Sequence, residues 1–374
     1  MGALNTDRAL LILLRARLPD ALLRSLLESH QTAADALAAA RHGAGLSLPV
    51  ESRRALEHPD RRCLDADLAW LGAPGRCLIG WQDPDYPALL RRTPAPPPLL
   101  FVSGDAALLW HPQVAMVGSR RPTPAGQARA RQFARAFASA GWAVTSGLAE
   151  GIDTAAHQGA LATGRTVAVV GTGLDLAYPA ANAALMARIA AEGTVVSEHP
   201  PGTPAIASHF PSRNRIIAGL SLGTLVVEAA MRSGALISAR LAAEAGREVF
   251  ALPGSLDNPV ARGCHRLIRE GAALVESPAE VLAALEPVAR ELADALRGRL
   301  RAAAENPATQ SAERQPAEHE DHNRLWSALG HDPTGMDSLA ERTGLTVAAL
   351  SSMLLIMELE GHVAADNGRY SRRS

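Results

Sequence analysis

Short apolar runs alternate with longer amphipathic stretches through the middle of the chain. Between residues 113 and 285, most of the short runs are followed by a segment whose apolar positions recur with helical spacing. This alternation predicts a doubly wound α/β domain with a mainly parallel sheet. The predicted strands cover residues 114–117, 143–145, 167–170, 194–196, 224–227, 248–252 and 273–275.

The hydrophobic pattern is different on the N-terminal side of this domain. Leucines with helical spacing recur in residues 1–70 and predict a small helical domain, which is either a packing module or an accessory for docking or for nucleic-acid binding. Proline is frequent in residues 71–112. We therefore interpret them as an irregular connector that contains one short strand, 99–102, and enters the core, residues 113–285.

A second change follows on the C-terminal side. Residues 286–322 begin rich in alanine, arginine and glutamate and then lose most apolar residues, which predicts a flexible linker. Residues 323–374 start a new core, with three helical segments and a hairpin that turns at Asn367-Gly368, the pattern of a winged-helix-like domain. The third helical segment, 346–360, has no arginine and two glutamates. We therefore favour a packing or protein-contact role over that of a transcription regulator.

Three local patterns predict where helices of the core begin. Thr123-Pro124 has the residue types of an N-cap and a first helical position. Asp153 can cap a helix that runs through His157, and Ser277 with Glu280 forms a capping box. We expect Asp153 and His157 to have capping or packing roles, because no serine or cysteine is spaced to act with His157 as a catalytic pair.

Charge and cysteine content narrow the possible chemistry. The net charge is −1, but from residue 111 to residue 271 there are 15 arginines against 10 acidic residues, which is compatible with a phosphate-bearing ligand. All 37 basic residues are arginine, which excludes a phosphate loop of the Walker type and a lysine Schiff base. The three cysteines are far apart and predict no metal site or disulfide framework. With no export signal and no apolar run long enough for a membrane span, we expect a cytoplasmic protein without cofactor.

Small and basic residues follow several of the predicted strands. In an open α/β sheet, ligands bind outside the carboxyl ends of the strands, where arginines and free helix amides can hold phosphate oxygens. Each of these clusters alone fits an ordinary turn, whereas together they favour an extended anion-binding groove over a catalytic site. The candidate residues are Gly118, Ser119, Arg120, Gly147, Gly171, Gly173, Arg213, Asn214, Arg215, Ser233 and Gly234.

The stretch HFPSRNRIIAGLS, residues 209–221, allows two interpretations. Arg213 and Arg215 either belong to a solvated helix start capped by Ser212, or they bind an anion. Their place at the end of a long proline-rich loop favours the ligand. The sequence leaves open which of the two arginines would face the ligand and which would face a core acid such as Glu228.

Six motifs of the core resemble, in this order, the bacterial DNA-processing protein A family, also called Smf. They are GSRRPTPAG, SGLAEGIDTAAHQGAL, VVGTGLDLAYPAAN, SEHPPGTPAIASHFPSRNRIIAGLS, VVEAAMRSGALISAR and VFALPGS, between about Leu78 and Leu285. The helical, SAM-like N-terminal region and the winged-helix-like end also match the family's usual arrangement. The resemblance implies an extended Rossmann-like core that binds single-stranded DNA, protects incoming strands in natural transformation and loads the RecA recombinase. It also implies a homodimer for which no catalytic activity is established.

The resemblance also bears on single residues. It supports the phosphate-binding roles of Ser119, Arg120, Gly147, Arg213, Asn214 and Arg215, and it adds Arg165, where family members commonly carry lysine. Beside these loops, Tyr178 and Phe210 are the candidates for base stacking. Gly263-Cys264-His265 departs from the family's usual Gly-x-Asn, which leaves the role of His265 open.

An enzyme is the alternative interpretation. The core distantly resembles nucleoside-monophosphate phosphoribohydrolases, which carry a PGGxGTxxE motif. The comparable stretch, residues 220–228, lacks the double glycine and places Glu228 one residue too far along. We therefore expect a binding protein rather than an enzyme.

Overall fold

The computed structural model describes residues 2–42, 48–305, 324–330 and 334–345, with residues 350, 353, 354, 357, 363–366 and 369–372. The chain divides into two compact units, residues 1–292 and 293–374. No helix in the described part of the chain is long and apolar enough to cross a membrane.

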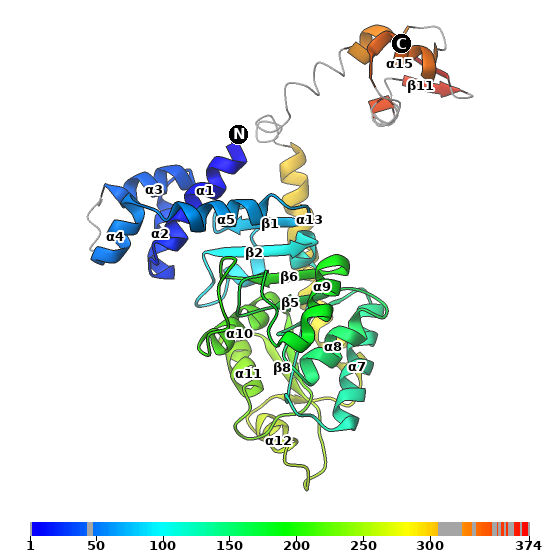
Figure 1. The fold of residues 1–374 in the computed structure, drawn as a ribbon. Helices are drawn as coiled ribbons and strands as arrows, with labels where there is room; N and C mark the ends of the chain where they lie inside the picture. The colour runs from blue at the N-terminus through cyan, green and yellow to red at the C-terminus, as the bar shows by residue number, and fades with distance from the viewer. Residues whose placement is uncertain are drawn as a thin grey trace. The chain divides into compact units, whose positions relative to one another are not determined.

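A nine-stranded sheet forms the centre of the first unit (Figure 1). All of its strand pairs from β6 to β9 are parallel, whereas β2 pairs antiparallel with both β1 and β6. The doubly wound, mainly parallel fold predicted from the sequence is thus confirmed. In sheet order the strands are β1 (Arg76–Gly80), β2 (Leu99–Gly104), β6 (Thr194–Ser197), β5 (Thr166–Val169), β4 (Ala143–Ser146), β3 (Gln113–Val117), β7 (Gly223–Val226), β8 (Glu248–Ala251) and β9 (Ala273–Leu274).

The order of these strands creates a crevice at the centre of the sheet. The chain proceeds from β3 through β4 and β5 to β6 on one side, and then returns to place β7, β8 and β9 on the other side of β3. Loops after β3 and β7 consequently lead to opposite faces, which leaves a ligand-binding crevice at the carboxyl ends of these strands.

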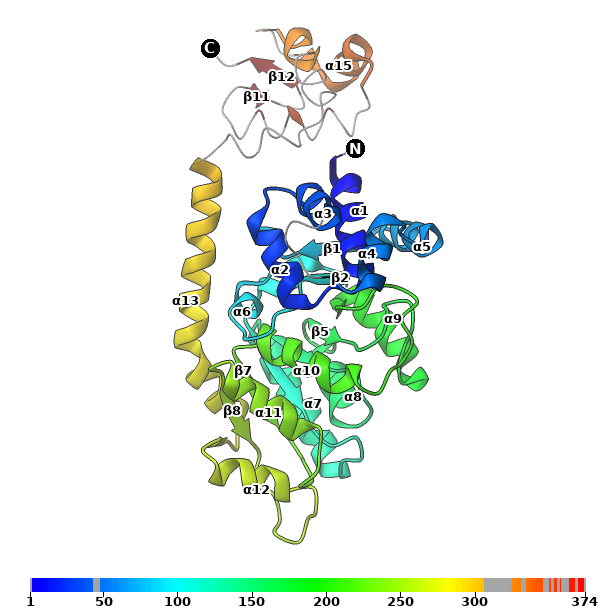
Figure 2. The ribbon, with the colours of Figure 1, turned by 90° about the vertical axis from the view of Figure 1, so that its left-hand side faces the viewer.

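Helices cover both faces of the sheet. Alternate residues of β3 enter two separate cores: Val114 and Met116 pack with helices α7 and α8, and Ala115 and Val117 with α10 and α11. Figure 2 shows α10 and α11 side by side on their face. The helices of the core are α7 (Pro124–Ser139), α8 (Ile152–Ala160), α9 (Ala183–Glu192), α10 (His209–Leu220), α11 (Ala235–Glu244), α12 (Arg262–Arg269) and α13 (Pro278–Glu305), with one 3₁₀ turn, η2 (Ala180–Asn182).

Two of the three predicted helix starts are confirmed. Thr123 is the N-cap of α7, and its side chain accepts a hydrogen bond from the amide of Gly126 at 3.0 Å. Ser277 donates to Glu280, which also accepts from the amide of Glu276 at the start of α13. Asp153 does not cap α8, because Gly151 holds the N-cap position and Asp153 lies within the first turn.

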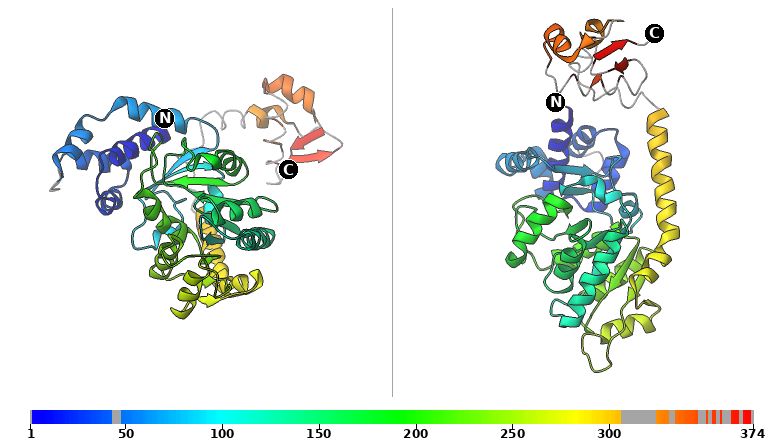
Figure 3. Two further views of the ribbon diagram at one scale, coloured as in Figure 1. Left: turned by 60° about the horizontal axis from the view of Figure 1, so that its bottom comes forward. Right: turned by 90° about the vertical axis from the view of Figure 1, so that its right-hand side faces the viewer.

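Five helices form the N-terminal part of the first unit and pack at the β1–β2 end of the sheet (Figure 3). Apolar side chains such as Leu11, Leu13 and Leu27 are buried among them, as the leucine spacing predicts. The ion pair of Arg15 with the buried Asp67 joins the first helix to the fifth. The helices are α1 (Gly2–Arg15), α2 (Asp20–Ser29), α3 (Ala33–Arg41), α4 (Val50–Glu57) and α5 (Arg61–Leu71).

The connector assigned to residues 71–112 contains more regular structure than the sequence indicated. The predicted strand at 99–102 is β2, but β1 is an unpredicted strand that pairs with it from Arg76↔Ser103 to Gly80↔Leu99. A short helix, α6 (Ala88–Arg91), and a 3₁₀ turn, η1 (Ala106–Trp110), complete this segment. Strand β1 gives a weak apolar pattern because its first residue is exposed and its last three are buried.

The second unit has its own small core. Leu325, Leu329, Leu339 and Val363 are buried together, next to a three-stranded sheet. Its described elements are α15 (Met336–Thr343), β10 (Thr334–Gly335), β11 (Val363–Asp366) and β12 (Arg369–Arg372). Strands β11 and β12 pair as the predicted hairpin. Its turn at residues 367–368 and most of the third helical segment, 346–360, lie outside the described residues.

The segment assigned to a flexible linker, residues 286–322, begins as helix. Helix α13 continues to Glu305, and residues 306–322 lie outside the described part of the chain. The alanine, arginine and glutamate that are common up to Glu305 have high helix propensity, which accounts for this difference. The boundaries between the five predicted segments remain predictions.

The junction of the antiparallel strands with the core provides a test of the packing. Gly104 has φ +113, and a Cβ there would lie 2.2 Å from the carbonyl oxygen of Gly193; its neighbour Gly75 has φ +72 and open space. We expect Gly104→Ala to lower the free energy of unfolding by about 3 kcal/mol or more, and Gly75→Ala by about 1 kcal/mol. Urea denaturation measures both, and equal losses would contradict the close approach at Gly104.

Candidate functional site

The loop after β3 is fixed between the loops after β4 and β7. The amide of Ser119 donates to the carbonyl oxygen of Glu228 at 2.7 Å, and the carbonyl oxygen of Ser119 accepts from the amide of Ile152 at 3.1 Å. The Ser119 hydroxyl accepts from the amide of Arg121. Gly118 and Ser119 therefore occupy the centre of the crevice as rigid backbone, and Arg120 extends from it with an exposed side chain.

Arg213 lies beneath this crevice rather than at its surface. Its residue is only 4% exposed, and its guanidinium donates to the carbonyl oxygens of Gly147, at 2.5 Å, and Val169. Its Nε donates to the side chain of Asn214. These bonds tie helix α10 to the carboxyl ends of β4 and β5.

Gly147 is the residue that makes room for this guanidinium. A Cβ at Gly147 would lie 2.3 Å from Nη2 of Arg213, closer than real side-chain contacts allow. The sequence suggested that the backbone of this loop approaches a ligand closely. In the structure, the close neighbour is an arginine of the same chain.

Burial and the neighbouring charges act in different directions on the pKa of Arg213. Burial lowers the pKa of Arg213 to about 10, while the carboxylate of Asp153 opposes this shift and the nearby Arg120 adds to it. Asp153 accepts hydrogen bonds from the amides of Gly147 and Ala149 at 3.2 and 3.3 Å. Burial raises the pKa of Asp153, and Arg213 is the first of the groups that oppose the rise. The site thus keeps a buried arginine and a buried acid near one another below the crevice.

Arg215 has a second structural role on the same helix. It forms a bidentate ion pair with Glu198, with N–O distances of 2.8 and 2.6 Å, and reaches Asp20 of helix α2 at 3.4 Å. The pair links the N-terminal helices to the loop after β6. Ser212 lies inside α10, which begins at His209, so the predicted cap at Ser212 is wrong.

Glu228 pairs with neither Arg213 nor Arg215. Its two carboxylate oxygens accept from the amide and the hydroxyl of Thr123 at 2.8 and 2.6 Å, and Asn258 approaches one of them at 3.5 Å. Glu228 therefore holds the start of helix α7. This is also the glutamate that the phosphoribohydrolase alternative would use.

Arg120 is the candidate arginine that stays available to a ligand. It forms no ion pair within the described part of the chain. Its charge nevertheless lowers the pKa of Arg213, after the effects of burial and of Asp153, so the two cations lie close together. The crevice consequently has an exposed cation at its surface, above the buried Arg213 and Asp153.

An aromatic pair stands beside the crevice. Tyr178, which is 49% exposed, and Phe210 have ring centroids 4.9 Å apart and planes tilted by 39°. Gly171 and Gly173 shape the loop that carries Tyr178: the Gly171 carbonyl oxygen lies 3.2 Å from Nδ1 of His209, and the Gly173 amide donates to Thr203. The predicted stacking residues are thus brought together next to the glycine-rich loop.

Two predicted positions lie after β7. Ser233 and Gly234 precede helix α11, where the Ser233 hydroxyl accepts from the amide of Ala235 at 3.3 Å. A Cβ at Gly234 would meet nothing within 4 Å. This side of the crevice is therefore open.

Arg165 is the one candidate that the structure places elsewhere. It precedes the amino end of β5 and forms an ion pair with Asp105, at the opposite edge of the sheet from the carboxyl-end loops. The structure thus places Arg165 apart from the other candidates, and its phosphate-binding role stays a prediction from the resemblance. The rule that ligands bind at the carboxyl ends of strands does not select Arg165, and the observed position of Arg165 agrees with that rule.

The histidines show what sequence reasoning predicted and what it missed. His157 is fully buried, with Nδ1 2.8 Å from the Thr166 hydroxyl, and burial lowers its pKa to about 3, which fits the expected packing role. His265 lies 3.0 Å from the carbonyl oxygen of Gly254. The stack of His199 on His209, with centroids 3.9 Å apart, was not foreseen, because the two are ten residues apart in an irregular loop.

The contrast between Arg213 and Arg120 can be tested by one substitution at both positions. Arg213→Met should lower the free energy of unfolding by about 3–5 kcal/mol, because two carbonyl groups lose their donor and Asp153 loses its nearby cation. Arg120→Met, at an exposed position, should change it by no more than about 0.5 kcal/mol. Urea denaturation compares them, and a similar effect of both would contradict the assignment.

Comparisons with known proteins agree with this architecture. A family model described as DNA recombination-mediator protein A matches residues 77–286, and one for the DprA winged helix domain matches residues 306–369. Protein Smf of Escherichia coli K12 is 41% identical over 330 residues, which cover 88% of this chain and 85% of that protein.

Two solved structures resemble the chain. The DNA processing protein A of Streptococcus pneumoniae has a TM-score of 0.66 and 38% identity, covering 74% of this chain and 97% of that one. The protein from Helicobacter pylori, whose structure is described as giving insight into its single-stranded DNA binding mode, has a TM-score of 0.50 and 32% identity over 54% of this chain and 93% of that one. Together with the matched family models, these likenesses confirm the resemblance seen in the motifs: the chain belongs to the DNA recombination-mediator protein A family, also called DprA or Smf.

Proposed function

We propose that this protein binds single-stranded DNA in the crevice at the carboxyl ends of β3, β4, β5 and β7, and that it acts there as a recombination mediator. The observation that carries the proposal is the exposed Arg120 beside the open glycine-rich loops, which the buried Arg213 holds in place from below. The single-stranded DNA binding of the Helicobacter pylori relative supports the same ligand.

The residues of the crevice divide into two groups in this proposal. Arg120 and the Ser119 hydroxyl contact phosphate, with Ser233 and Gly234 on the open side of the crevice. Gly118, Gly147, Gly171, Gly173, Arg213, Asn214 and Arg215 shape and hold the loops. Arg165 has no part in this binding.

Tyr178 and Phe210 give the preference for a single strand. An exposed ring can stack on an unpaired base, and such stacking is nearly independent of sequence. The bases of a duplex are already stacked on one another and cannot use this pair. Binding should therefore favour single strands, depend steeply on salt and vary little with base composition.

The salt dependence of binding tests the role of Arg120. With a labelled oligothymidylate in fluorescence anisotropy, Arg120→Ala should weaken affinity roughly tenfold and make the slope of log Kobs against log[salt] shallower by about 0.7, the value for one lost phosphate contact on a single strand. Arg135→Ala, which removes an exposed arginine from helix α7, is the matched control and should leave both unchanged. An unaltered slope for Arg120→Ala, or tighter binding of a duplex, would overturn the proposal.

We further propose that the protein acts in the cytoplasm as a homodimer, protects incoming strands in natural transformation and loads RecA onto them, without catalysis of its own. Strand β9 supports the dimer. Among the described residues it pairs with β8 on one side only, and its Leu274 is 49% exposed. A free strand edge with an apolar side chain is suited to pairing with a second copy.

Sedimentation velocity tests both proposed partners, the second copy of this chain and RecA. The protein should sediment as a dimer, and Leu274→Glu should give a monomer, because two negative charges would meet near the symmetry axis. Added RecA should form a faster-sedimenting complex with the wild-type protein. A monomeric wild type, or RecA that sediments independently of it, would contradict the respective partner.

A further inference from the structure

A second basic hollow lies on the N-terminal helices, away from the crevice residues. It has a volume of about 590 Å³ and is lined by one face of α1, one face of α3 and the connection from α4 to α5. The floor is apolar and includes Ala9, Ile12 and Leu37, all buried. Three arginines, Arg8, Arg41 and Arg61, line it against one glutamate, Glu57.

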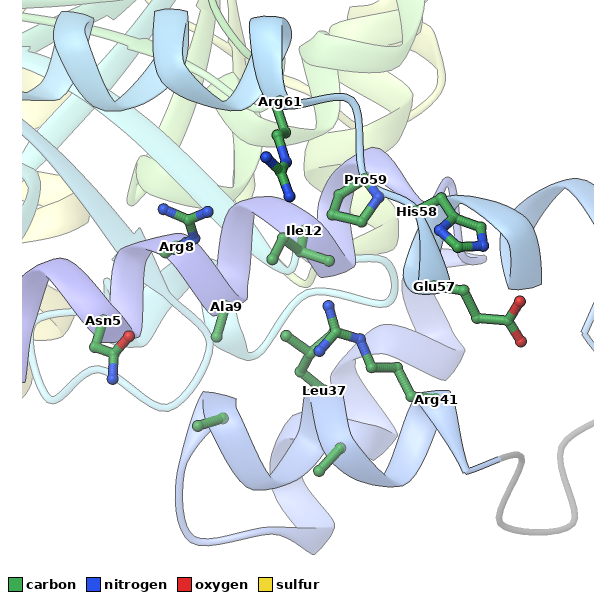
Figure 4. A pocket seen from close by; sticks show the side chains of 12 residues that line it. Asn5, Arg8, Ala9, Ile12, Leu37, Arg41, Glu57, His58, Pro59 and Arg61 are labelled. Atoms are coloured by element: carbon green, nitrogen blue, oxygen red, sulfur yellow. The ribbon is translucent and has the colours of Figure 1, made fainter.

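The three arginines face the hollow from different helices. Figure 4 shows Arg61 and Arg41 on the two sides of Ile12, with Arg8 one turn away along α1. Arg41 donates through Nε to the carbonyl oxygen of Leu56 at 2.9 Å, which leaves its other nitrogens for a ligand. None of the three forms an ion pair with a carboxylate among the described residues. The three guanidinium groups are exposed, and none of them pairs with Glu57. Together they point to an anionic ligand.

A larger cleft adjoins this hollow on the side of the crevice loops. The cleft has a volume of about 1090 Å³, and Ile12, His58 and Pro59 line both spaces. Its far wall is the loop from Glu198 to His209, which leads directly into helix α10. Arg17, Arg54 and Arg62 also line this cleft and form no ion pair within the described part of the chain. Four acids line it as well: Asp20 and Glu198, which pair with Arg215, and Glu51 and Asp60.

We propose that the hollow lined by Arg8, Arg41 and Arg61 is a second binding site for single-stranded DNA, which takes nucleotides of a strand that continues from the crevice through the cleft. This inference rests on the proposed function. The guanidinium groups hold phosphates, and the flat apolar floor receives a base, as single-strand sites combine charge with apolar contact. The hollow has three arginines against one glutamate, and the far wall of the cleft ends at His209, next to Phe210 of the aromatic pair. This continuity with the crevice favours a nucleic acid over an acidic peptide, which would need no path to the crevice.

Oligonucleotides of two lengths separate the two sites. A strand of about 6 nucleotides has the size of one single-strand site, whereas about 30 nucleotides exceed one site several-fold and reach both. The test variant is Arg8→Gln/Arg61→Gln. The matched control is Arg131→Gln/Arg135→Gln on helix α7, which removes the same charge from exposed positions. Both are compared with the wild-type protein by fluorescence anisotropy in a salt series.

For the long strand, the test variant should bind roughly tenfold more weakly than wild type, with a salt slope shallower by about 1.4, the value for two phosphate contacts. The short strand should bind the wild type, the test variant and the control alike. Equal weakening at both lengths, or no weakening at either, would overturn the second site while leaving the crevice intact. Failure of the short strand to bind the wild type would instead overturn the proposed function.

An acidic peptide is the competing ligand, and the same variants test it. A labelled amphipathic peptide of glutamate and leucine should not distinguish the wild type from Arg8→Gln/Arg61→Gln. Binding that requires the two arginines, together with unchanged affinity for the long strand, would reassign the hollow to a protein partner.

Discussion

The burial of one guanidinium group constrains the whole crevice. A buried cation is tolerated only where hydrogen bonds and an opposite charge compensate for lost hydration, and Arg213 obtains these from the carbonyl groups of Gly147 and Val169, from Asn214 and from the nearby Asp153. Satisfying it fixes the ends of β4 and β5 against helix α10. The loop that carries Tyr178 follows β5, and Phe210 lies in α10 itself, so the shape of the crevice depends on a group that is buried below it.

Arginine therefore serves two purposes in this chain. Arg213 and Arg215 use their planar, multidentate geometry to join helix α10 to the strands and to the N-terminal helices. Arg120, and the arginines of the N-terminal hollow, keep exposed side chains without ion pairs in the described part of the chain. Only the second kind can exchange water and counterions for phosphate, which is the physical origin of salt-dependent binding to DNA.

Much of the fold could be predicted from the sequence because short buried strands and helix starts have local signals. The predicted strand at 143–145 is one residue shorter than β4, and Thr123 caps α7 as its residue type indicated. Strand β1 was missed because only part of it is apolar. The rule that ligands bind at carboxyl ends selected the loops that meet at the crevice, but it could not tell which residues in them are buried.

The division between Arg213 and Arg120 could not be predicted, because burial depends on contacts between distant residues. Gly147 and Arg213 are 66 residues apart, and both stood among the candidate ligand-binding positions. Arg165 entered through family resemblance, although its strand end faces the other edge of the sheet. Glu228 looked like a partner for an arginine, yet Thr123, 105 residues away, uses both its oxygens.

The most direct test of this account observes the two arginines in the same sample. In NMR spectra of the arginine Nε–H groups, adding a short oligothymidylate should shift the signal of Arg120 and leave that of Arg213 in place. The Arg213 proton should also exchange slowly with water in the free protein, because the group is buried and hydrogen-bonded. A ligand-dependent shift of Arg213 as large as that of Arg120, with rapid exchange in the free protein, would contradict the claim that one arginine supports the crevice and the other binds the strand.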